Sequence, residues 1–152
     1  MRASLLTLTL IVVACGEAGE EAEPVDQVPE AAAPSLSLTD VAGTWNVRVM
    51  AETGDSVLTE YELYATGTTT GWSFKFAGTT DTLPIQSVSL RGDTIVTRAG
   101  PFPSALRPGV MVVTDGMSWL ENGVMIGRTV AHYSTTGPDS VLTLRIEGRR
   151  AP

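Results

Sequence analysis

Few side chains in this sequence have the chemistry of a catalytic or metal site. Cys15 is the only cysteine and His132 is the only histidine among the 152 residues. Zinc and copper sites take several ligands from histidine and cysteine, so these two residues predict no metal site. A serine nucleophile would need His132 as its base and a Gly-x-Ser-x-Gly turn, which the sequence lacks. We therefore expect no metal, no cofactor and no enzymatic activity.

Two carboxylates in close sequence, Glu60 and Glu62, could in principle share acid-base work. They lie two residues apart in a segment that alternates polar and apolar residues, so they share one face of a strand. A solvated outer face explains the same spacing, and we expect that arrangement. The lone His132 alternates with Ala131 and Tyr133 and is expected to be structural.

The position of Cys15 sets it apart. Arg2 gives a positive start, the apolar run Leu5–Val13 follows, and small residues surround the cysteine. This order is typical of a secretory signal, and the apolar run is too short to span a bilayer. A stray thiol behind an ordinary secretory signal is the alternative.

The segment Val12-Val13-Ala14-Cys15 resembles the lipobox of bacterial lipoproteins. The resemblance implies that residues 1–14 are a signal peptide removed before Cys15. It also implies that the Cys15 sulfur carries a diacylglyceryl group and that the new amino end is acylated, for instance with palmitate. In this family an aspartate after the cysteine often retains the protein on the inner membrane. Gly16 therefore favours the outer membrane of the cell envelope.

The acidity of the chain is concentrated near its start. The formal net charge is −7, yet from Ser37 onward 11 acidic and 9 basic residues leave a net of only −2. Residues 15–36 are rich in Glu, Ala and Pro and poor in large apolar residues, which predicts a disordered tether. A binding tail is the alternative for this acidic run. Because no basic surplus exists, we expect no nucleic-acid partner.

The remaining residues, 37–150, predict a single all-β domain. Short runs alternate β-branched or aromatic residues with polar ones, and Gly, Asp, Asn and Pro interrupt them. The expected strands are Trp45–Ala51, Val57–Ala65, Trp72–Phe76, Ile85–Arg91, Thr94–Arg98, Val110–Leu120, Val124–Tyr133 and Ser140–Glu147. Eight strands with short connections favour a small antiparallel up-and-down barrel that closes on itself.

Three connections carry specific expectations. The segment Gly100–Pro108 holds three prolines and predicts a loop, with one helical turn at Ser104–Arg107 as an option. Asp115-Gly116 interrupts the sixth strand and predicts a bulge or a hairpin turn. Asn122-Gly123 is the strongest hairpin signal in the sequence.

The start of the first strand, Gly43-Thr44-Trp45, resembles the opening of the calycins, the group of lipocalins, fatty-acid-binding proteins and avidins. In lipocalins an arginine of the last strand packs over that tryptophan, and the resemblance assigns this role to Arg145. It implies a lipocalin-like barrel. The sequence lacks the long first loop and the C-terminal helix of a typical lipocalin, so a deep ligand cup is not implied.

One face of neighbouring strands is strongly aromatic and apolar. Trp72, Phe74 and Phe76 alternate on one strand, and Tyr61 and Leu63 fall on the strand before it. These five residues are the candidate ligand-binding set, since concave sites for small molecules are mostly apolar. We expect a membrane-anchored, non-enzymatic module that binds a small apolar ligand. The alternative is a solid barrel whose aromatic residues are packed core and whose outer surface docks an envelope protein.

Overall fold

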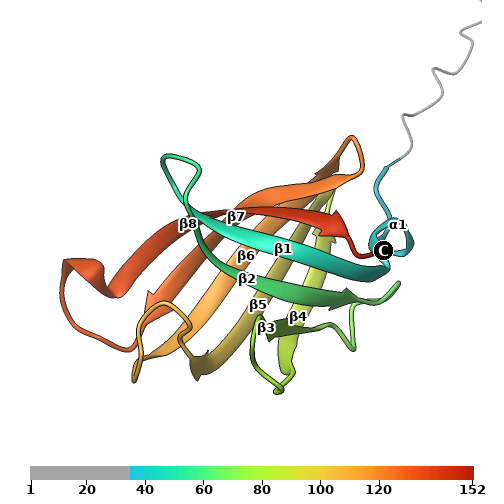
Figure 1. Cartoon of the computed structure of the whole chain (residues 1–152). Coiled ribbons are helices and arrows are strands. Elements are labelled where there is room, and N and C mark those ends of the chain that lie inside the picture. The colour runs from blue at the N-terminus through green and yellow to red at the C-terminus, as the bar shows by residue number, and fades with distance from the viewer. Residues whose placement is uncertain (1–34) are drawn as a thin grey trace, which may run out of the picture. The chain divides into compact units, whose positions relative to one another are not determined.

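The computed structural model describes residues 35–152, which form a closed barrel of eight antiparallel strands (Figure 1). Each strand pairs with its neighbours in sequence, and β8 returns to pair with β1. The strands are β1 (Gly43–Ala51), β2 (Val57–Ala65), β3 (Ser73–Phe76), β4 (Leu83–Arg91), β5 (Thr94–Pro103), β6 (Met111–Glu121), β7 (Val124–Tyr133) and β8 (Val141–Arg150). The predicted all-β up-and-down barrel is confirmed.

Two short helical segments accompany the strands, α1 (Leu38–Val41) and η1 (Pro138–Ser140). Within residues 35–152, no helix is both long and apolar enough to cross a membrane. The predicted signal peptide 1–14, the lipidation of Cys15 and the tether up to residue 34 fall outside the described residues.

The hairpin predicted at Asn122-Gly123 joins β6 to β7. Both residues have positive φ, 51° and 78°, as the tightest right-twisted hairpin turns require. Asparagine and glycine are the residues that adopt this conformation at least cost. The turn fixes an unbroken register from Glu121↔Val124 to Val112↔Tyr133, and this register decides which residues face inward.

The prediction of a loop at Gly100–Pro108 is wrong for its first residues, because strand β5 continues to Pro103. The pairing with β6 shifts between Ala99 and Phe102, and Gly100 has a φ of 103° there. A bulge of this kind is where a strand tolerates proline, so Pro101 does not end it. The optional helical turn at Ser104–Arg107 is absent, since Ser104 has no regular structure and residues 105–107 form bends.

Asp115-Gly116 forms neither of the expected irregularities. Both residues pair in regular register with β5 and β7, so β6 is continuous there. Gly116 faces inward, where a side chain would collide with Thr97. Asp115 faces outward and accepts two hydrogen bonds from Arg98, at 2.7 and 2.9 Å. The residue types at these two positions are therefore explained by side-chain packing on the inner and outer faces of the strand, and not by a turn.

One end of the barrel is packed solid. The most deeply buried side chains gather toward this end, where β1 and β3 begin and β8 finishes; they are Val41, Trp45, Val47, Trp72, Ile95 and Met125. The indole nitrogen of Trp45 donates to the carbonyl of Val41 at 2.8 Å, which holds α1 at this end. The C terminus lies beside α1 (Figure 1), where the amide of Ala151 donates to the Thr44 carbonyl. We call this the closed end.

Candidate functional site

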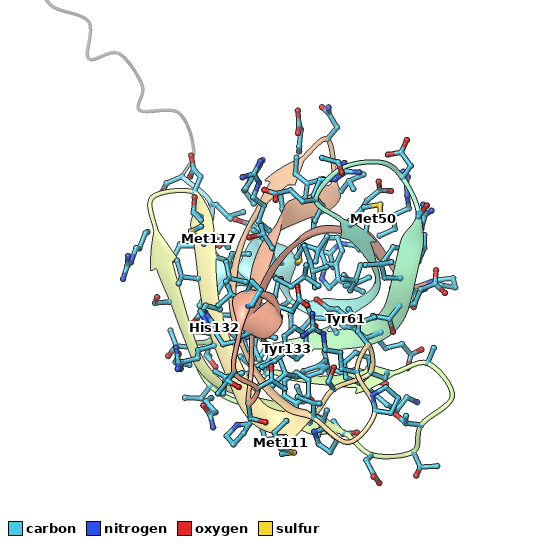
Figure 2. The ribbon with its side chains drawn as sticks, turned by 90° about the vertical axis from the view of Figure 1, so that its left-hand side faces the viewer. Met50, Tyr61, Met111, Met117, His132 and Tyr133 are labelled. Atoms are coloured by element: carbon cyan, nitrogen blue, oxygen red, sulfur yellow. The ribbon has the colours of Figure 1, made fainter. Side chains whose placement is uncertain are left out.

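A cavity of about 100 Å³ lies inside the barrel toward the opposite end, which we call the open end. This end carries the connections between β1 and β2, between β5 and β6, and between β7 and β8. Figure 2 views the molecule from this end and shows Tyr61 and Tyr133 within the ring of strands, with Met117 and His132 outside it. The residues that line the site face the interior of the barrel, so the site is a pocket between the strands that opens toward this end.

Aromatic rings form much of the cavity wall. Five of them line it: Tyr61, Phe74, Phe76, Phe102 and Tyr133. They come from β2, β3, β5 and β7. Phe74 is the centre of the group, with its ring centroid 5.5 Å from that of Tyr61, 5.4 Å from Phe76 and 5.3 Å from Phe102, all edge to face. Such contacts add to the stability that ring burial provides and fix the shape of the wall.

Aliphatic and hydroxyl side chains complete the lining. The aliphatic set is Val49, Ile85, Ala99, Ala105, Leu106, Val112, Ala131, Leu144 and Ile146, and the hydroxyl set is Thr59, Thr97, Ser104, Thr114 and Thr129. Alternation along the strands explains their positions, since every second residue of β6 and β7 faces inward. The site is apolar with a few convergent oxygen atoms, as ligand pockets usually are.

Three of the five predicted ligand-binding residues line the cavity. They are Tyr61, Phe74 and Phe76. Trp72 instead lies at the closed end, 2 % exposed, and its indole nitrogen donates to the carbonyl of Thr68. Leu63 pairs with Trp45 across β1 and β2 and is buried in the core. Alternation placed all five on one face, but it carries no information on depth along the barrel axis.

Phe102, Tyr133 and the threonines also line the cavity and are not among the residues predicted from the sequence. Phe102 falls in the proline-rich segment that was expected to be a loop, so it was not considered as a strand residue. Tyr133 could have been found, because Met125, Ala131 and Tyr133 alternate on β7 and are all buried. Threonine is common on both faces of strands, so no sequence signal assigns it to the interior.

The arginine that packs over Trp45 is Arg150, and Arg145 does not make this contact. The Arg150 guanidinium lies 4.5 Å from the Trp45 ring centroid and donates to the carbonyls of Asp40 and Ala42. The strand period explains the correction, since Leu144, Ile146, Gly148 and Arg150 share the inward face of β8. Gly43 leaves room, because a Cβ there would lie 2.9 Å from the Arg150 guanidinium.

Arg145 faces outward and holds the turn between β1 and β2. Its guanidinium donates to the carbonyls of Ala51 and Gly54 and pairs with Asp55 at 3.1 Å. It therefore belongs to the outer surface near the open end, away from Trp45.

The two carboxylates Glu60 and Glu62 lie on the outer face, as expected. Glu62 accepts a hydrogen bond from Tyr64 at 2.7 Å and pairs with Lys75 at 3.3 Å. These two donors lower the pKa of Glu62, the Tyr64 hydrogen bond contributing most. An open polar hollow of about 580 Å³ covers this face, larger than the internal cavity but walled by opposite charges beside one another. Such ion pairs are typical of a solvated surface.

His132 is also on the outer face, outside the ring of strands (Figure 2). Its Nε2 lies 3.3 Å from Asp115, which Arg98 also binds. Among residues 35–152, no group of three or more His, Cys, Asp or Glu side chains could hold a metal ion.

Comparisons with protein-family models, with curated proteins and with solved structures found no match. The class of protein is therefore defined by its geometry alone: a closed eight-stranded antiparallel barrel with a small apolar cavity at one end.

Proposed function

We propose that this chain is a non-enzymatic envelope lipoprotein, lipocalin-like in its barrel, that binds a small apolar ligand in the cavity at the open end. The single observation that carries the proposal is a cavity walled by five aromatic rings where the closed end of the same barrel is packed solid. A barrel under selection for stability alone would be expected to fill both ends.

The cavity volume limits the ligand. About 100 Å³ is smaller than the ~150 Å³ apolar cavity that admits benzene, and well below the ~300–1,000 Å³ of drug-sized pockets. The buried part of the ligand is then one small ring or a short branched chain. A longer molecule would have to extend through the open end.

The test uses the full-length chain carrying Cys15→Ser, which removes the proposed lipid without shortening the protein. Cyclopentane is titrated while backbone amide signals are followed by NMR. We expect saturable shifts at Phe74, Phe102 and Tyr133, and none at Trp72 or Ile95 of the closed end.

A blocking variant and its matched control make this test specific. Ala131→Phe places a ring in the cavity, because Ala131 lines it, and should abolish binding. Val130→Phe puts the same ring on the outer face of β7 and should leave binding unchanged. Absence of saturable shifts in the parent chain would reject the ligand-binding function.

Membrane anchoring is proposed on the residues around Cys15. Each acyl chain contributes ~0.8 kcal/mol per buried CH₂, so a protein that carries two or three acyl chains stays bound to a membrane. Wild type should partition into the detergent phase and Cys15→Ser into the aqueous phase. Gly16 after the cysteine supports an outer-membrane location, which fractionation of the envelope would check.

An assembly role is the second candidate, and one observation favours it. Met117 and Trp119 on the outer face of β6 are 51 % and 39 % exposed, and Val96 and Ile126 pair beside them. Exposed apolar side chains that adjoin one another can mark a protein interface. If this surface docks an envelope protein, replacing Met117 and Trp119 by serine should remove a specific cross-linked product while cyclopentane binding persists. Unchanged cross-linking would exclude this surface.

A further inference from the structure

The polar groups of the cavity are all uncharged. None of its lining residues is Asp, Glu, Lys, Arg or His, so each polar side chain among them ends in a hydroxyl. An ionised ligand group buried here would lose its hydration without gaining a counter-charge. This bears on which ligand the proposed binding function concerns, and the inference below rests on that function.

Three hydroxyls converge on one wall of the cavity. Thr97, Gly116 and Thr129 are direct neighbours across β5, β6 and β7, and Thr114 lies two residues along β6 on the same face. A Cβ on Gly116 would lie 2.5 Å from the Thr97 hydroxyl and 3.7 Å from that of Thr129. Both hydroxyls therefore lie close to the gap that the missing side chain leaves.

These hydroxyls have hydrogen-bonding capacity to spare. None of Thr97, Thr114 and Thr129 makes a side-chain hydrogen bond with another of residues 35–152. Among residues 35–152, every side-chain oxygen or nitrogen that is fully buried has a hydrogen-bond partner. An oxygen without a partner is therefore at least partly accessible. The three hydroxyls are thus accessible from the cavity, where water or a ligand can bind them.

Three aromatic rings, those of Tyr61, Phe74 and Phe76, lie on β2 and β3 together with Thr59. β2 and β6 are four strands apart in the ring of eight, so Tyr61 faces the hydroxyl wall across the barrel. Burial raises the pKa of Tyr61, so its phenol stays neutral. The three hydroxyls thus lie together, and Phe102 and Tyr133 lie further along β5 and β7, so a small ligand can contact aromatic rings and a hydroxyl at the same time.

Arg107, a cation beside the cavity lining, already has binding partners. Arg107 lies 4.1 Å from the ring centroid of the lining residue Tyr133 and donates to the carbonyl of Asp139. This places its guanidinium between the β5–β6 and β7–β8 connections and outside the cavity lining.

We propose that the cavity selects an uncharged ligand with a small apolar body and one oxygen, an alcohol, ketone or ether, which hydrogen-bonds to Thr97, Thr114 and Thr129. A fatty-acid carboxylate does not satisfy this lining, and neither does an ammonium group. The selectivity comes from hydroxyls arranged around Gly116 in a site without charge.

The test compares four probes of similar size: cyclopentane, cyclopentanol, cyclopentanecarboxylate and cyclopentylammonium. Each is titrated by NMR into full-length Cys15→Ser chain and into the same chain with Thr97→Val and Thr129→Val. Valine keeps the shape of threonine and suits a strand, so the variant should fold. Losing the hydrogen bonds should weaken cyclopentanol about tenfold relative to cyclopentane, and both ions should bind the parent at least ~100-fold more weakly than cyclopentanol.

Thr143→Val is the matched control, because Thr143 faces outward on β8. It should change neither the affinity of cyclopentanol relative to cyclopentane nor that of the ions relative to cyclopentanol. If neither neutral probe binds the parent chain, the binding function itself fails. If cyclopentane and cyclopentanol bind but their ratio is the same in parent and double variant, the hydroxyl wall has no role and this inference is overturned while the binding function stands. Carboxylate binding as tight as that of cyclopentanol would overturn it too and would point to Arg107.

Discussion

The two ends of this barrel differ in how their side chains fill the interior. At the closed end, two tryptophans, Ile95 and Met125 fill the interior, and α1 and Arg150 cover it. At the open end, five aromatic rings line a cavity and leave it unfilled. The ends differ in the backbone as well as in side-chain size, because the strand pairing shifts between Val49 and Met50, between Ile85 and Ser87, and between Ala99 and Phe102, all toward the open end.

This contrast separates stability from binding along one axis. Filled space contributes dispersion and hydrophobic free energy, whereas a cavity forfeits both. The closed end should therefore dominate the free energy of unfolding, and the open end should dominate ligand affinity. Substitutions of the same kind at the two ends test that division.

The largest effect is expected from Trp45→Ala. Trp45 is fully buried and bonds to Val41, so its loss leaves a large void and detaches α1. We expect the free energy of unfolding to fall by about 3–5 kcal/mol in denaturant titrations. Trp119→Ala, at a tryptophan 39 % exposed on the outer face, should cost about 1 kcal/mol or less. Similar losses for both would mean that the closed end is not the stability core.

Two inward glycines of adjacent strands allow a finer comparison. Gly127→Ala would bring a methyl group against the β6 backbone, at the Met117 carbonyl and 2.8 Å from Cα of Ser118. Gly116→Ala, on the cavity wall, would come too close only to the movable Thr97 hydroxyl, at 2.5 Å. We expect the free energy of unfolding to fall by about 3 kcal/mol in Gly127→Ala and by about 1 kcal/mol in Gly116→Ala.

In ligand binding the order of the two variants should be reversed, with the larger loss of affinity in Gly116→Ala. Gly116→Ala narrows the cavity and should weaken cyclopentane, whereas Gly127→Ala leaves the lining intact. If Gly127→Ala were the milder change in stability, the β6 and β7 backbones would be less rigid than their continuous pairing indicates.

Much of the barrel could be predicted because alternation and turn chemistry are local. The bounds predicted for β2 and β7, Val57–Ala65 and Val124–Tyr133, match the structure, and Asn122-Gly123 forms the expected hairpin. The errors at Gly100 and Gly116 have a different origin. There, tertiary packing decides whether a glycine ends a strand or gives room to a neighbour, and a single sequence does not show the neighbour.

The candidate site could be predicted only in part for a related reason. Alternation identified the inward faces of β2 and β3, and so found Tyr61, Phe74 and Phe76. Depth along the barrel depends on strand tilt and register across the ring, which placed Trp72 at the closed end. The error at Arg145 was one of face and not of depth, because Arg145 lies on the outer face of β8 and the strand period places Arg150 over Trp45.

A smaller effect distinguishes those two arginines. Arg150→Ala removes the contact with Trp45 and two hydrogen bonds to the segment around α1. We expect a loss of about 1–2 kcal/mol and faster amide exchange at Ala42 and Trp45. Arg145→Ala, whose partner Asp55 is almost fully exposed, should cost under ~1 kcal/mol and leave exchange at α1 unchanged. Equal exchange in both variants would remove Arg150 from the closed-end structure.

The smallest expected effect is an acid-dependent loosening of the closed end through Asp40. Its carboxylate accepts a hydrogen bond from the Ser37 amide at 2.8 Å and another from the Ser37 hydroxyl at 2.9 Å. These bonds, the backbone one first, hold the pKa of Asp40 below its ordinary value of 3.8. A carboxyl whose folded pKa is lowered contributes stability above its unfolded pKa and loses it as pH falls through the folded pKa. The Ser37 amide shift should therefore titrate with a midpoint below 3.8, and in Asp40→Asn this titration should disappear. A midpoint at or above 3.8 would mean that Asp40 does not anchor the start of α1, which would then be held at the closed end by its contacts with Trp45 and Arg150.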